Sequence, residues 1–159
     1  MKRIACLALV LIGCGDTVPV VLNFPSFDTF VRSETARILV VDTDGDAGVC
    51  PDLLSQAELG VLDSVAVRDT GPQSVCEFQA GRVSLNGAPE GVRAYVAVAE
   101  DSSGVALLTG CTISDVHVDA APLEIVMAPT DEYRTQFGAG SPEAMCTPEA
   151  KCQRGCREE

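Results

Sequence analysis

Short apolar segments separated by turn-forming residues dominate the chain between residues 82 and 129. In the clearest of them, from Val92 to Val98, every second residue is Val or Ala, so one face of an extended strand would be apolar. Asn86-Gly87 precedes this segment and Asp101-Ser102-Ser103-Gly104 follows it, and both combinations favour turns. Regular short strands with turns between them predict a small antiparallel β-sandwich, so we expect a mainly β fold.

The remaining apolar segments extend this pattern. Ile38–Val41 is almost wholly apolar, which suits a strand buried on both faces. One short helix is expected over Pro51–Leu59, where Ser55 and Glu58 have the spacing of a capping box. Because aromatic residues make up only 4% of the chain and Trp is absent, the core must be built mainly from Val, Leu, Ile and Ala. Further strands are expected over Val20–Phe24, Val65–Arg68, Arg82–Leu85, Val105–Leu108 and Leu123–Met127.

A limited part of the chain resembles a known kind of module. Over Arg82–Thr109, the Gly-containing turn Pro89-Glu90-Gly91 precedes the strand Val92–Ala99. This order resembles the strand pattern of small transthyretin-like or immunoglobulin-like envelope modules. The resemblance implies a fold and transfers no functional residues, because such folds carry many unrelated functions.

The first 14 residues have the organisation of a bacterial lipoprotein signal. Lys2 and Arg3 precede the apolar run Ile4–Ile12, which is shorter than the about 20 residues of a membrane-spanning helix but suits a signal peptide. Leu11-Ile12-Gly13-Cys14 resembles the lipobox of bacterial lipoproteins. The resemblance implies a diacylglycerol on the sulfur of Cys14, cleavage just before this residue, and usually a further acyl chain on the new amino terminus.

Acyl chains on Cys14 would anchor the protein to the cell envelope, because each buried methylene contributes about 0.8 kcal/mol. In the Gram-negative sorting scheme that this signal resembles, Asp directly after the Cys retains a lipoprotein at the inner membrane. Here Gly15 follows and Asp16 comes one place later, which implies the outer membrane. The predicted organisation is a signal peptide over 1–13, a lipidated tether over 14–19, a β-sandwich domain over 20–129 and a Cys-rich polar tail over 130–159.

Six cysteines remain once Cys6 is removed with the signal peptide and Cys14 carries lipid. An even number in an oxidising compartment predicts three disulfides, although the sequence does not choose among the 15 connectivities. Three cysteines lie in the body and three in the tail, so an odd number of bridges must join the two. A zinc site over Cys146-x5-Cys152-x3-Cys156 is the disfavoured alternative, because structural zinc usually takes four ligands. The six are Cys50, Cys76, Cys111, Cys146, Cys152 and Cys156.

The chain is acidic. Its formal charge is −12, and removal of Lys2 and Arg3 takes it to −14. Such a surface repels phosphate backbones, so nucleic acid is excluded as a partner. A soluble, self-repelling surface is the favoured interpretation, and an acidic recognition face is the alternative.

Asp42, Asp44 and Asp46 resemble the start of a calcium-binding loop. Ala47 stands where an EF-hand needs Gly, and Leu53 stands where it needs a bidentate Glu, so an EF-hand is excluded. A solvated turn is favoured over a weaker Ca²⁺ contact in the same loop.

His117 is the only histidine. Asp115, His117 and Asp119 would share one face of a strand, and an ordinary hydrated face is favoured over a ligand row because Val116 and Val118 alternate with them. A hydrolytic triad would need a nucleophilic Ser beside the histidine, but there is no Gly-x-Ser-x-Gly elbow.

The sequence therefore leads to three hypotheses of function. The first is a non-enzymatic lipoprotein held to the lipid bilayer by its acyl anchor, with a disulfide-stabilised β-sandwich that contacts another envelope component or has a structural role. The second is a module that binds Ca²⁺ or a glycan through Asp42–Asp46. The third is a hydrolase that depends on His117. No cofactor other than the lipid, and Ca²⁺ under the second hypothesis, is expected.

Overall fold

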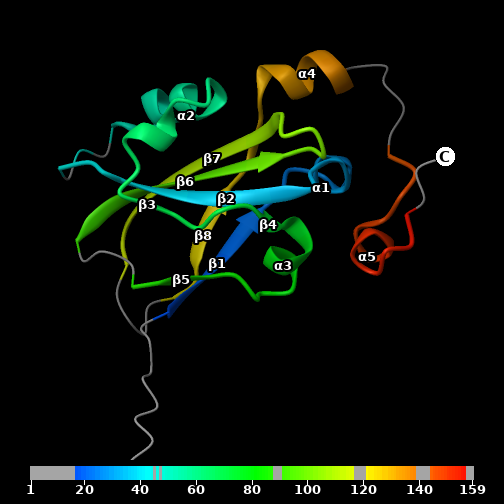
Figure 1. Cartoon of the computed structure of the whole chain (residues 1–159), viewed down its shortest axis with the longest axis horizontal. Coiled ribbons are helices and arrows are strands. Elements are labelled where there is room, and N and C mark those ends of the chain that lie inside the picture. The colour runs from blue at the N-terminus through cyan, green and yellow to red at the C-terminus, as the bar shows by residue number, and fades with distance from the viewer. Residues whose placement is uncertain are drawn as a thin grey trace, which may run out of the picture.

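The computed structural model describes residues 17–44, 46, 48–87, 91–116, 121–138 and 144–156, and it is shown in Figure 1. These residues form two β-sheets and several short helices. The elements are β1 (Thr17–Asn23), α1 (Phe27–Arg32), β2 (Thr35–Asp42), α2 (Cys50–Glu58), the 3₁₀ turn η1 (Leu62–Ser64), β3 (Arg68–Asp69), β4 (Gln73–Ser74), α3 (Val75–Gln79), β5 (Ser84–Asn86), β6 (Val92–Glu100), β7 (Ala106–Asp115), β8 (Leu123–Val126), β9 (Ala128–Pro129), α4 (Asp131–Phe137) and α5 (Pro148–Cys152).

Two packed sheets confirm the mainly β, sandwich prediction. The large sheet has the strand order β3-β2-β6-β7-β9, with β4 also paired to β2, and the small sheet has the order β5-β1-β8. Neighbouring strands run antiparallel except for β1 and β8, which pair in parallel with Val20 opposite Leu123. Gly87 takes the positive φ expected of a turn, but this turn leads from the small sheet to the large one, since β5 pairs with β1 rather than with β6.

The main core fills the space between the two sheets. Alternation along each strand turns one set of side chains inward, as the strand period requires. The inward residues come from β1 (Val18, Val20, Leu22), β2 (Ala36, Ile38, Val40), β6 (Tyr95, Ala97, Ala99) and β8 (Leu123, Ile125).

A second core covers the opposite face of the large sheet. Leu39 and Val41 of β2 point to this side and pack with Leu53 and Ala57 of α2. Figure 1 shows the resulting layers, with α2 on one side of the large sheet and the small sheet on the other. The prediction that Ile38–Val41 is buried on both faces is therefore confirmed.

Gly110 allows the chain to pass between the sheets after β8. A Cβ atom at this position would lie 2.5 Å from the carbonyl oxygen of Val126 and 3.0 Å from the sulfur of Met127. Only glycine leaves room for the backbone here, where the chain leaves β8 in the small sheet and enters β9 in the large sheet.

Two local predictions are wrong in detail. Helix α2 was expected with a Ser55–Glu58 capping box, but its N-cap is Val49 and Pro51 lies in the first turn, where its fixed φ suits a helix start. The small strand expected over Val65–Arg68 is displaced toward the C-terminus, since β3 covers only Arg68–Asp69 and follows the η1 turn. A true capping box occurs at α1, where Ser26 and Thr29 bond reciprocally.

Candidate binding pocket

The six cysteines form three disulfides: Cys50–Cys111, Cys76–Cys152 and Cys146–Cys156. One bridge lies within the body, one joins body to tail, and one lies within the tail, so the predicted odd number of connecting bridges is confirmed. Because Cys152 is bonded to Cys76, the three tail cysteines do not gather as zinc ligands.

The carboxylates of Asp42 and Asp46 accept hydrogen bonds from backbone N–H groups of their own loop. The Asp42 carboxylate accepts a hydrogen bond from the Asp44 N–H at 3.2 Å and lies 3.7 Å from the Arg93 guanidinium. Asp46 accepts a hydrogen bond from the Gly48 N–H at 2.7 Å. Within the described ranges no three His, Cys, Asp or Glu side chains gather in a way that could hold a metal ion.

Three predicted functional positions lie outside the described residues: Cys14, His117 and Asp119, together with the signal peptide over 1–13 and the expected turn residues Pro89 and Glu90. Asp115, which was expected to share a strand face with His117 and Asp119, is exposed at the end of β7. In the described part of the chain, no helix combines the length and the apolar character that a bilayer crossing requires.

An apolar pocket of about 550 Å³ lies where β1 leads into α1. Three of the five phenylalanines of the chain line it, although aromatic residues are scarce elsewhere. We call this hollow the Phe27 pocket; its lining residues are Leu22, Phe24, Pro25, Ser26, Phe27, Phe30, Gln79 and Pro148.

The local sequence explains how the aromatic wall is built. Pro25 follows the end of β1 and has no N–H to continue the strand ladder. Ser26 then caps α1, which places Phe30 inward, in edge-to-face contact with Phe24 at 5.1 Å between ring centroids. Phe27, at the first position of the helix, stays outside with 79% of its surface exposed.

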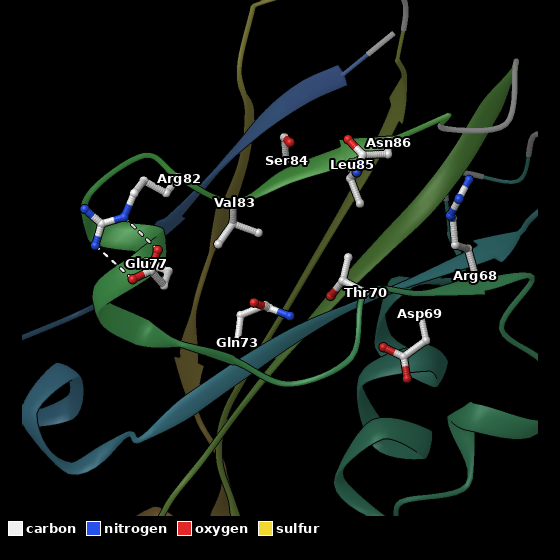
Figure 2. A pocket seen from close by; sticks show the side chains of 10 residues that line it. All are labelled: Arg68, Asp69, Thr70, Gln73, Glu77, Arg82, Val83, Ser84, Leu85 and Asn86. Carbon is white, nitrogen blue, oxygen red and sulfur yellow. Dashed lines mark hydrogen bonds and ion pairs between the residues drawn. The ribbon is translucent and has the colours of Figure 1, made fainter. Parts of the chain in front are cut away.

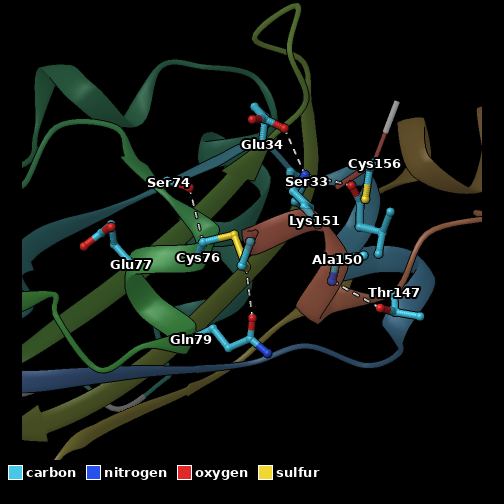
Figure 3. The surroundings of a disulfide bond; sticks show 12 residues. Ser33, Glu34, Ser74, Cys76, Glu77, Gln79, Thr147, Ala150, Lys151 and Cys156 are labelled. Carbon is cyan, nitrogen blue, oxygen red and sulfur yellow. Dashed lines mark hydrogen bonds and ion pairs between the residues drawn. A yellow bond between two sulfur atoms is a disulfide. The ribbon is translucent and has the colours of Figure 1, made fainter. Parts of the chain in front are cut away.

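The opposite wall comes from distant parts of the chain. Gln79 ends α3, and Pro148 begins α5. The Cys76–Cys152 bridge joins these two helices, as Figure 3 shows. A five-residue helix has no stability of its own, so α5 depends on such attachments.

Lys151 supplies the second attachment of α5. Its ammonium group donates hydrogen bonds to the carbonyl oxygens of Val31 at 2.8 Å and Ser33 at 2.7 Å, and to the Glu34 carboxylate at 2.9 Å (Figure 3). Val31 lies in the last turn of α1 and Ser33 is its C-cap, so a cation is favourable at this end of the helix.

Asp28 joins α1 to the tail at a third point. Its carboxylate accepts hydrogen bonds from the Tyr133 hydroxyl at 2.6 Å, the Ala144 N–H at 2.7 Å and Nε of Arg32 at 2.7 Å. Burial raises the pKa of Asp28, but these three donors together outweigh it and hold the pKa below its ordinary value. Burial and the bond to Asp28 raise the pKa of Tyr133 to about 12. All of these groups serve to hold α4 and residue 144 against α1.

A second hollow, of about 350 Å³, is polar and lies between β5 and the edge formed by β3 and β4 (Figure 2). Arg82 and Glu77 form a two-bonded ion pair at one end of it, at 2.6 and 2.8 Å. Arg68 donates to the carbonyl of Gly87 at the other end. We call it the polar cleft; it is lined by Arg68, Asp69, Thr70, Gln73, Glu77, Arg82, Val83, Ser84, Leu85 and Asn86.

Fold and site together define a disulfide-bonded β-sandwich with a peripheral apolar pocket. Comparison of the chain with family models, with curated proteins and with solved structures finds no match.

The Phe27 pocket does not follow from the residue patterns of the sequence described above. A signal was present, because Phe24, Phe27 and Phe30 lie close together in a chain that is poor in aromatic residues. The spacing alone does not show that Phe27 stays exposed or that Gln79 and Pro148 face it, since both depend on long-range packing.

Proposed function

We propose that this chain is a lipid-anchored protein of the bacterial cell envelope, and that its β-sandwich is a non-enzymatic module that binds another envelope component in the Phe27 pocket. One observation carries the proposal: Phe27 is 79% exposed beside an apolar hollow. Burying a Phe side chain contributes about 1.5–3 kcal/mol, so an exposed one beside a concave apolar surface is well suited to a partner.

The disulfides support the export that this proposal requires. Three bridges are typical of a chain that folds outside the cytoplasm, where thiols are oxidised. The anchor itself rests on the lipobox-like Leu11–Cys14 segment, and residue order after Cys14 favours the outer membrane.

The position of the pocket suits a partner other than the anchoring membrane. Strand β1 begins at Thr17, three residues after Cys14, and its seven residues span about 23 Å at about 3.3 Å per residue. The pocket lies at the far end of this strand. A bilayer that holds Cys14 would therefore be at the opposite end of β1, and the pocket would face away from it.

Site-specific photo-crosslinking in intact cells tests the proposal. A photoreactive residue replaces Phe27 in the full-length chain, and a matched control replaces Leu59, an apolar residue with similar exposure at 73% at the end of α2. We expect one discrete adduct from position 27 and none from position 59. Equal labelling at both positions, or none at either, would contradict the proposal.

The anchor is tested separately by Cys14→Ser. We expect this protein to leave the membrane fraction and to lack the mass of the acyl chains that the native protein carries. A native protein without acyl mass would remove the lipoprotein part of the proposal.

A glycan is the second candidate partner, and the polar cleft favours it. The side chains of Gln73, Ser84 and Asn86 have no hydrogen-bond partner among the described residues, so they are available to sugar hydroxyls (Figure 2). A Gln73→Ala, Asn86→Ala double variant would lose binding on an oligosaccharide array if the cleft were the site, whereas Phe27→Ala would not.

A further inference from the structure

The apolar lining of the Phe27 pocket and the net negative charge of the chain narrow the class of its occupant. We infer that the pocket receives an apolar side chain carried by a positively charged polypeptide. The inference rests on the proposed function and adds the chemistry of the partner to it.

The lining fits an apolar side chain better than a sugar. Leu22, Phe24 and Phe30 offer carbon surface, and only two lining residues have polar side chains. The Ser26 hydroxyl is already occupied, because it accepts the hydrogen bond of the Thr29 N–H at 3.2 Å in the cap of α1. The oxygen of the Gln79 amide lies 3.2 Å from the Cys152 sulfur, so its NH₂ group is left to bond a peptide carbonyl, whereas a sugar needs several polar partners.

Two cationic side chains, one on α5 and one after α3, are already paired. Arg82 is paired with Glu77 at 2.6 Å, and Lys151 with Glu34 at 2.9 Å. A carboxylate is available at the pocket wall. The Glu149 carboxylate, next to Pro148 in the pocket wall, has no hydrogen-bond or ion-pair partner among the described residues.

The net negative charge of the chain favours some conceivable occupants of the pocket over others. A second copy of this chain would bring the same strong negative charge, and anionic lipid or polysaccharide would also be repelled. A polypeptide with Lys or Arg beside an apolar anchor residue would be attracted and guided to the pocket. Of these occupants, the cationic polypeptide is the one that suits both the apolar lining of the pocket and the net negative charge of the chain.

Three synthetic peptides test this inference on the exported Cys14→Ser protein, which keeps every described residue. One carries a central Phe between lysines, the second replaces Phe with Ala, and the third replaces the lysines with glutamates. Fluorescence anisotropy measures binding. We expect the second and third peptides to bind about tenfold more weakly than the first, or worse.

Variants locate the binding. We expect Phe27→Ala to weaken binding of the peptide with Phe between lysines by about tenfold. The change Leu59→Ala, at the matched exposed residue, should leave this binding unchanged. Glu149→Gln should weaken binding of the same peptide and make this binding less sensitive to salt concentration.

The possible negative results distinguish failure of the inference from failure of the proposed function. Equal binding of the lysine and glutamate peptides, or binding of anionic vesicles instead, would overturn the inference. A concentration-dependent dimer that Phe27→Ala abolishes would show a second copy to be the occupant. If no peptide binds but the crosslinked adduct at position 27 still forms in cells, the cationic polypeptide is the wrong class of partner, and the proposed function still stands. Loss of the adduct as well would remove both.

Discussion

Helices α2 and α5 are each joined to the body of the protein by a disulfide, but they differ in how much apolar surface they bury. Helix α2 has nine residues, inserts Leu53 and Ala57 into an apolar interface, and is bridged to β7 by Cys50–Cys111. Helix α5 has five residues and buries only Pro148, and it is held by Cys76–Cys152 and by Lys151. The Cys50–Cys111 bridge reinforces a helix that already packs through a hydrophobic interface. The Cys76–Cys152 bridge holds a helix that has almost no such interface.

The contrast explains why the apolar hollow lies beside α5 and not beside α2. Because α2 covers its face of the sheet with side chains, that side is filled. Because α5 is held at a distance by a bridge and by one long lysine, the space between it and Phe27 is not filled from within the described chain. The end with less packing is therefore the end that can receive a partner.

The largest effect should come from removing the bridge to α5. We expect the Cys76→Ser, Cys152→Ser double variant to lose about 3 kcal/mol of unfolding free energy and to lose peptide binding at the Phe27 pocket. Trypsin should then cut after Lys151 in the otherwise folded protein. The control pair Cys50→Ser, Cys111→Ser should lose similar stability yet keep binding; loss of binding in both pairs would break the distinction between the two helices.

The next effect concerns the interface of α2. Leu53→Ala should lower the free energy of unfolding by about 2–3 kcal/mol, because the side chain is buried against the large sheet. Binding at the distant pocket should be unchanged in the folded fraction. Denaturant titration and peptide anisotropy on the same samples check both; a loss below about 1 kcal/mol would mean that α2 is not the better-packed helix.

A smaller loss is expected when the lysine attachment is removed. Lys151→Met keeps the length of the side chain but removes its hydrogen bonds to Val31 and Ser33, so we expect about 1 kcal/mol of destabilisation and weaker peptide binding. Lys151→Arg, which keeps the charge, is the control. Equal behaviour of the two variants would show that charge at the end of α1 does not hold α5.

The smallest effect should appear as a dependence on pH. The folded-state pKa of Asp28 is lowered, so its contribution is present above the unfolded value, about 3.9, and is lost as the pH falls through the folded one. The pKa of Tyr133 is raised to about 12, so its contribution is complete below the unfolded value, about 10, and is lost as the pH rises toward 12. Tyr133→Phe should flatten the alkaline limb of the stability curve and reduce the acidic one, as denaturation at each pH would reveal. An unchanged curve would rule out the Asp28–Tyr133 bond as the attachment of α4.

Much of the fold followed from the order of residue types along the chain. The alternation in β6 placed Val96 on one face and Tyr95 on the other, and the apolar run Ile38–Val41 indicated burial on both faces; both are confirmed. Cysteine parity required a bridge from the tail to the body, and Cys76–Cys152 is that bridge. These features depend on strand period and on counting, which the sequence alone determines.

Tertiary structure decided which elements meet. Strand β8 pairs in parallel with β1 across about a hundred residues, and Pro148 comes to lie near Phe27 because Cys152 bonds to Cys76 rather than to a nearer cysteine. A strand pattern shows which face is buried but not which strand will be its neighbour, since pairing depends on closing long loops and filling a shared core. The Phe27 pocket is a product of that long-range packing.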